Sequence, residues 1–160
     1  MRKVVSNTTP ILSLLKIGKL DILRELYGKI LIPQAVYNEI ETGKNKDYYT
    51  DINELDWMDI KPIESSSARL YLFDLDDGEA ETIILAQEQN ADLLIIDEKI
   101  GRRYASQIPI PVTGTIGVLL KAKTHGIITA VAPLLQELRD KSSWMNNGLF
   151  EKTLHLAGEL

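Results

Sequence analysis

The residues of this chain whose types and spacing could do chemistry are three carboxylates and one amide, two of them at the ends of short apolar segments and two early in expected helices. The chain contains no cysteine, which excludes a thiolate metal site and a disulfide framework. Carboxylate and amide oxygens instead suit a hard divalent cation, Mg²⁺ or Mn²⁺. Such an ion can generate a nucleophilic water and stabilise a phosphate under attack, so these residue types indicate phosphodiester hydrolysis. The four candidates are Asn7, Glu39, Glu79 and Asp97.

The segment that organises this set is the apolar run at residues 93–96, which stops abruptly at Asp97. A run this short, bounded by polar residues, is typical of a strand buried on both faces of a parallel sheet, and we expect it to be the central strand. Residues 3–6 and 29–32 predict two further strands, and residues 57–60 predict an edge strand.

Segments with helical spacing alternate with these strands. Thr9 and Pro10 predict the start of the first helix, as a cap and a first helical residue. Further helices are expected over residues 21–27, 33–40, 79–87, 99–107, 115–125, 130–141 and 147–157, with a short strand near 111–112. This alternation implies an α/β fold with a parallel sheet and right-handed crossovers.

Such crossovers bring the carboxyl ends of all strands to one edge of the sheet. Asn7 and Asp97 end strands there, while Glu39 and Glu79 lie early in helices that start there, so we expect the carboxylates to surround a shared cavity. Glu81 is an alternative to Glu79; the two lie about 200° apart around a helix, and Glu79 is nearer the helix start. Each acid alone would be interpreted as a solvated residue or as one stabilised by a helix dipole. Their joint placement at one edge favours a functional site instead.

Three motifs resemble those of the PIN-domain ribonucleases. Residues 4–12 (VVSNTTPIL) are similar to the opening motif, 32–40 (IPQAVYNEI) to the second, with Glu39 as its acid, and 78–86 (GEAETIILA) to the third. The resemblance extends to about Lys123.

The spacing of the last two acids resembles one branch of these ribonucleases in particular. Asp97 follows Glu79 by 18 positions, as the third and fourth acids do in toxin-type PIN proteins. Gly-Arg-Arg at 101–103 and Thr-Gly-Thr at 113–115 also resemble the toxin-like prokaryotic branch, the VapC-like toxins of type II toxin–antitoxin systems.

The resemblance implies a three-layer α/β/α sandwich with a central parallel sheet, in a single domain over residues 1–160 whose helices from about residue 129 are an appended part. It implies a Mg²⁺- or Mn²⁺-dependent endoribonuclease acting on RNA, often with a small antitoxin partner and homodimerisation. Asn7 departs from the family, which usually has Asp there. An amide oxygen can ligate a cation but supplies no charge, so weaker metal binding and even an inactive enzyme are expected alternatives.

Candidate substrate-binding residues surround the acids. Arg102 can grip phosphate oxygens bidentately, although a solvated helix face, with Arg103 paired to surface acids, is an equal alternative. Thr113 and Thr115 indicate a helix cap first and a hydroxyl lining the site second. Lys99 and Thr8 complete the substrate-binding set, and Glu98 is a further candidate acid.

Trp144, Met145, Leu149 and Phe150 form an apolar cluster near the C-terminus. Core packing is the default interpretation, and contact with a dimer mate or an antitoxin is the alternative.

Composition is that of a globular protein of 160 residues, with 44% hydrophobic and 26% charged residues. No apolar run reaches the length of a membrane span and no signal-peptide pattern is present, so a cytoplasmic location without membrane contact is expected. A net charge of −5 argues against a large nucleic-acid footprint, so RNA binding would need a local basic patch.

Three functions remain open from the sequence. The first is a PIN-type ribonuclease acting as a toxin, and the second is a catalytically silent PIN module that binds RNA or a protein. The third, a nucleotide-binding sensor, is disfavoured because no phosphate-cradling glycine loop occurs.

Overall fold

The structure is a computed structural model that describes residues 2–104, 109–142 and 144–160, with the side chains of Glu98 and Arg102 left undescribed. Within these ranges, five strands form one all-parallel sheet in the order β3-β2-β1-β4-β5. The strands are β1 (Val4–Ser6), β2 (Ile30–Pro33), β3 (Met58–Lys61), β4 (Leu93–Ile95) and β5 (Val112–Thr113).

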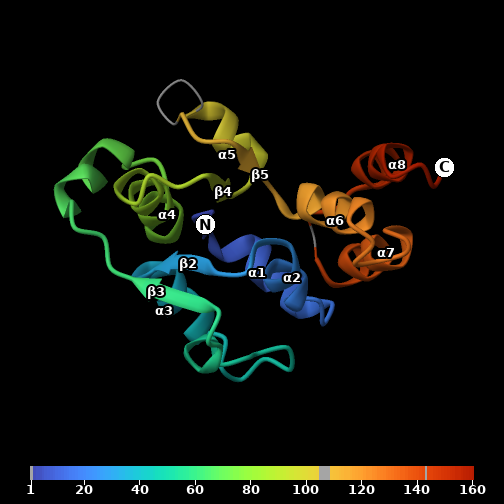
Figure 1. Cartoon of the computed structure of the whole chain (residues 1–160), viewed down its shortest axis with the longest axis horizontal. Helices are drawn as coiled ribbons and strands as arrows, with labels where there is room; N and C mark the ends of the chain where they lie inside the picture. Colours follow the sequence, from blue (N-terminus) through green and yellow to red (C-terminus); the bar gives the residue numbers. More distant parts are fainter. Residues whose placement is uncertain (1, 105–108, 143) are drawn as a thin grey trace.

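Helices connect the strands and cover both faces of the sheet (Figure 1), which gives the expected three-layer α/β/α sandwich. The helices are α1 (Thr8–Lys16), α2 (Asp21–Tyr27), α3 (Gln34–Glu41), α4 (Asp77–Glu88), α5 (Glu98–Arg103), α6 (Thr115–Thr124), α7 (Ala132–Lys141) and α8 (Asn147–Leu156), with short 3₁₀ turns η1 (Ile52–Glu54) and η2 (Ser66–Leu72).

Alternate residues of each strand supply the two layers of the core, because successive side chains point to opposite faces. Val4 and Ile95 belong to the cluster that includes α1, α2, α6 and α7, whereas Val5 and Leu94 belong to the cluster of α4 and η2. Burial on both faces explains why these strands read as unbroken apolar runs rather than alternating ones.

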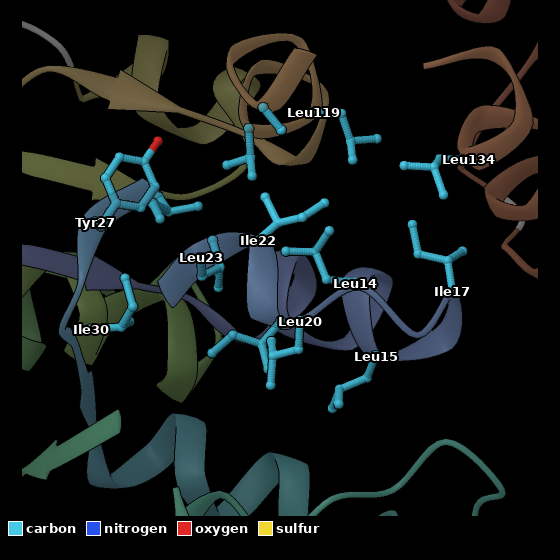
Figure 2. Packing of buried hydrophobic residues seen from close by; sticks show 14 of the residues in the cluster. Leu14, Leu15, Ile17, Leu20, Ile22, Leu23, Tyr27, Ile30, Leu119 and Leu134 are labelled. Carbon is cyan, nitrogen blue, oxygen red and sulfur yellow. The ribbon is translucent and has the colours of Figure 1, made fainter. Parts of the chain in front are cut away.

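Helices α1 and α2 carry the larger cluster toward the C-terminal helices. Figure 2 shows Leu14 and Ile17 extending toward Leu134 of α7, and Ile22 lying below Leu119 of α6. The helices after β5 therefore join the same core as the sheet.

The C-terminal segment is fastened by a carboxylate. Glu159 accepts hydrogen bonds from the backbone N–H groups of Val131 (2.7 Å) and Ala132 (2.9 Å), at the start of α7, and from Lys123 Nζ of α6 (2.9 Å). The bond from Val131 first, and then those from Lys123 and Ala132, lower the pKa of Glu159 to about 2 against the raising effect of burial. In the described part of the chain, no helix has the length and apolar character needed to span a membrane.

Three expectations about the elements were wrong in detail. β1, and not the run at 93–96, occupies the middle of the sheet, because β4 lies between β1 and β5. An apolar pattern indicates that a strand is buried on both faces. Because β1 and β4 are both buried in this way, the pattern could not show which of them lies in the middle of the sheet. The first helix starts at Thr8, so Thr9 is not its cap. α5 ends at Arg103, and residues 105–107 of the helix expected over 99–107 lie outside the described residues. The edge position of β3 is confirmed.

Candidate active site

Glu39 lies on α3 against the start of α4. Its Oε1 accepts a hydrogen bond from the Gly78 N–H (3.0 Å), and its Oε2 accepts one from Thr8 Oγ1 at the start of α1. A Cβ at position 78 would lie 2.4 Å from Glu39 Oε1, so only glycine allows this approach. Burial raises the pKa of the Glu39 carboxyl, and Asp76 raises it further, against the lowering effect of the Thr8 and Gly78 hydrogen bonds.

Glu79 is fixed in the first turn of α4 by a capping box. Its Oε1 accepts from the Asp76 N–H (3.1 Å), and Asp76 Oδ1 accepts from the Glu79 N–H (2.8 Å). Burial raises the pKa of the Glu79 carboxyl most, and the negative charges of Asp76, Glu39 and Asp97 add to it. Glu39 and Asp97 are therefore both close enough to Glu79, at the carboxyl edge of the sheet, for their charges to act on its carboxyl.

Asp97 lies just beyond β4, where the chain leaves the sheet for α5. Its side chain is exposed, and its Oδ1 accepts a hydrogen bond from the Lys99 N–H (2.8 Å). The preceding residue is still tied to the edge strand, since the Ile96 N–H donates to Thr113 O (2.9 Å). Strand pairing therefore sets where the Asp97 carboxylate emerges.

Asn7 is nearly buried, with 3% of its surface exposed, between β1 and α1. It occupies the N-cap position of α1, yet among the described residues its side chain makes no capping hydrogen bond. The Thr82 hydroxyl lies 3.5 Å from Asn7 Oδ1 and 2.6 Å from Gly78 O. Since a hydroxyl has one proton, and the shorter bond takes it, the contact with Asn7 is weak. Thr82 therefore holds the amide oxygen of Asn7 only weakly.

Glu81 is held at the start of α3, the helix that carries Glu39. Its Oε1 accepts a hydrogen bond from the Ala35 N–H (3.1 Å), in the first turn of α3. It thus satisfies a free donor at a helix start, a common role for a carboxylate.

The candidate substrate-binding residues are dispersed around this edge. Thr8 donates to Glu39, Thr113 Oγ1 lies against Gly117, and Lys99 is exposed. Thr115 is buried and lines a cavity together with Asp97. The side chains of Arg102 and Glu98 lie outside the described residues, so their predicted roles stay predictions.

Arg103, the neighbour of Arg102, has a surface partner: its Nη1 lies 3.1 Å from Asp74 Oδ2. The expected pairing of Arg103 with a surface acid is confirmed.

Sequence reasoning missed the residues that hold the acids in place. Asp76 had a readable signal, because an acid three residues before Glu79 is a capping-box pattern. Thr82 and the close approach at Gly78 had none, since both depend on partners 75 and 39 positions away in the chain.

The oxygen donors at this edge fit a hard cation by chemistry, being three carboxylates and an amide oxygen. The negative charges of Asp76, Glu39 and Asp97 add to the burial that raises the pKa of the Glu79 carboxyl, and a divalent cation would relieve that repulsion. Among the side chains that the structure describes, no three His, Cys, Asp or Glu residues form a group that could hold a metal ion. Hydrogen bonds from Thr8, Gly78, Asp76 and Lys99 hold the acids here instead.

Comparison with known proteins identifies the class. A family model described as a PIN domain matches residues 3–159, so the chain belongs to the PIN-domain family. PIN domains are in general nucleases, hydrolases that cleave phosphodiester bonds, and they generally use divalent metal ions. The match spans the sheet and the C-terminal helices alike, beyond the residues that carry the three motifs. Neither the curated proteins nor the solved structures contain a match to this chain.

Proposed function

We propose that this protein is a metal-dependent endoribonuclease in which Glu39, Glu79, Asp97 and Asn7 hold Mg²⁺ or Mn²⁺. The observation that carries the proposal is the placement of three carboxylates at one edge of a parallel sheet: Glu39 of α3 accepts from the Gly78 N–H beside Glu79 of α4, and Asp97 follows β4. When bound, the ion would activate water and neutralise charge on the phosphate.

The protein's own residues orient the ligands. Thr8 and the Gly78 N–H hold Glu39, the capping box holds Glu79, and the Lys99 N–H holds Asp97. Membership of the PIN family supports nuclease chemistry, and the toxin-like motifs support a role as the toxin of a toxin–antitoxin pair, with a small antitoxin partner, homodimerisation and RNA as substrate. Arg102, Lys99, Thr113 and Thr115 are the proposed contacts with RNA.

A catalytically silent PIN module that binds RNA or a protein is the second candidate. Asn7 favours it, because the amide supplies no charge where the family usually has Asp. With one anion fewer, the metal site should fill only at higher metal concentration.

One experiment separates the two candidates. Labelled structured RNA is incubated with the protein in Mn²⁺, in Mg²⁺ and in EDTA, beside the Asp97→Asn and Asn7→Asp variants, and metal binding is followed by calorimetry. A nuclease cleaves with Mn²⁺ or Mg²⁺, loses cleavage with EDTA or Asp97→Asn, and gains most from Asn7→Asp at low metal concentration. A silent wild type with an active Asn7→Asp variant would establish the binding module. If neither form binds metal or cleaves, the nuclease proposal is refuted.

A further inference from the structure

A cavity of about 330 Å³ adjoins the acidic edge, as we call the place where Asn7, Glu39, Glu79 and Asp97 lie, and Asp97 is part of its lining. Helices α1, α6 and α8 wall it, and Trp144 precedes α8 at its rim. Its size lies at the small end of the range for ligand pockets. The lining residues used below are Pro10, Ile116, Leu149, Trp144, Lys152 and Asp97.

The lining combines a flat apolar interior with two opposite charges. Pro10, Ile116 and Leu149 supply apolar surface, and Trp144, still 37% exposed, supplies an aromatic ring. Lys152 and Asp97 are its charged members. An aromatic wall with a cation nearby is the combination by which proteins bind unpaired bases of a nucleic acid: the ring stacks on the base and the cation contacts phosphate.

Asp97 connects this cavity to the acidic edge, because it belongs to both. In a nucleic acid, each base is joined to its phosphate through one sugar. If a phosphate of an RNA chain lies at the acidic edge, a neighbouring base of that chain is therefore within reach of the cavity, provided that the base is not stacked in a duplex.

We propose that this cavity binds one unstacked nucleobase of single-stranded RNA against Trp144, with Lys152 contacting an adjacent phosphate. The inference rests on the proposed function, which it deepens by selecting single strands over duplexes. It also assigns a role to the C-terminal helix α8, which contributes Leu149 and Lys152 to the cavity and none of the four acidic-edge ligands.

The test uses tryptophan fluorescence, because the chain has only two tryptophans. In a Trp57→Phe protein, Trp144 is the sole emitter; Trp57 is a buried core residue before β3. The protein is titrated with a labelled single-stranded RNA in a buffer that contains Ca²⁺, an ion that takes oxygen ligands. The integrity of the RNA is checked on a gel. Binding is followed by anisotropy and by Trp144 emission, beside a duplex of the same sequence.

We expect single-stranded RNA to quench Trp144 and the duplex to leave it unchanged. Trp144→Ala should weaken single-strand binding at least about fivefold, the loss typical of one stacked base. Trp144→Phe should retain most of the affinity, which separates stacking from misfolding. Phe73→Ala removes an aromatic ring that is 85% exposed on another surface, and it should leave binding unchanged.

Several results would overturn the inference. RNA could bind by anisotropy without changing Trp144 emission, or Phe73→Ala could weaken binding as much as Trp144→Ala does. Alternatively, Trp144 could become shielded as protein concentration rises without RNA, with a dimer seen by sedimentation, which would assign the cavity to a second copy of the chain. Quenching without cleavage in Mn²⁺ would refute only the nuclease proposal, whereas absence of all RNA binding would refute both.

Discussion

Gly78→Ala tests the contact that positions Glu39. The added Cβ would lie 2.4 Å from Oε1 and 2.7 Å from Oε2 of Glu39, far inside an optimal separation of about 3.5 Å. The obstacle is the end of a flexible side chain, so the Glu39 carboxylate should swing away rather than α4 move. It would then lose the hydrogen bonds from Gly78 and Thr8.

The net effect on stability follows from two opposing contributions. Alanine favours the helical backbone over glycine by up to about 1 kcal/mol. Hydrogen bonds to a charged group contribute about 1.5–3 kcal/mol, and the lower value suits Glu39, whose carboxylate regains water when released. With two such bonds lost, we expect the free energy of unfolding to fall by about 2–3 kcal/mol. The melting temperature should then fall by about 4–12 °C for a chain of this size.

In the Gly78→Ala protein, metal affinity should fall together with folding stability. The reason is that Gly78 orients Glu39, a proposed ligand, without itself touching the ion. Loss of such a supporting contact typically weakens metal affinity about 10–100-fold. Thermal unfolding and Mn²⁺ calorimetry measure the two effects. Gly43→Ala is the matched control: its Cβ would meet its nearest atoms at 3.5 Å, an ordinary contact, so both readouts should be nearly unchanged.

A Gly78→Ala protein with unaltered melting temperature and Mn²⁺ affinity would refute the placement of Glu39 against α4. A double variant sharpens the test. Once Glu39→Ala has removed the carboxylate, Gly78→Ala should no longer destabilise the protein, so the two changes should be strongly non-additive. Additive losses would mean that the Cβ clashes with something else.

Two further predictions concern single carboxylates. Glu79→Gln keeps the capping box but removes a charge that Glu39 and Asp97 oppose, so the metal-free protein should keep its melting temperature while its Mn²⁺ affinity falls. Glu81→Gln should leave Mn²⁺ affinity unchanged. Equal losses of Mn²⁺ affinity in the two variants, measured by calorimetry, would contradict this assignment. Glu159 has its pKa lowered to about 2 in the folded protein, so its contribution to stability is present above its ordinary pKa near 4.5 and is lost as pH falls toward 2. Glu159→Gln should therefore lower the melting temperature at pH 7 by a few degrees, and this difference should shrink below pH 4.5. A difference in melting temperature that is independent of pH would contradict the prediction.

Local patterns in the sequence were sufficient to predict the elements. The apolar runs predicted the strands because both faces of a parallel sheet are buried, and the alternation of strands with helical periods predicted parallel crossovers. Those crossovers place Asn7 and Asp97 at the same edge, since each ends a strand whose carboxyl end faces the same way. The edge strand at 57–60 was also predictable, being bounded closely by proline.

Tertiary structure alone decided which side chains meet at that edge. Burial on both faces is common to β1 and β4, so no local pattern could place β1 in the middle of the sheet. Glu79 and Glu81 could not be separated by helical angle; their partners, Asp76 for one and Ala35 of α3 for the other, depend on how α3 packs against α4. The cavity at Trp144 likewise exists only because α8 returns to the carboxyl edge of the sheet, a contact between residues far apart in the chain that composition and periodicity do not encode.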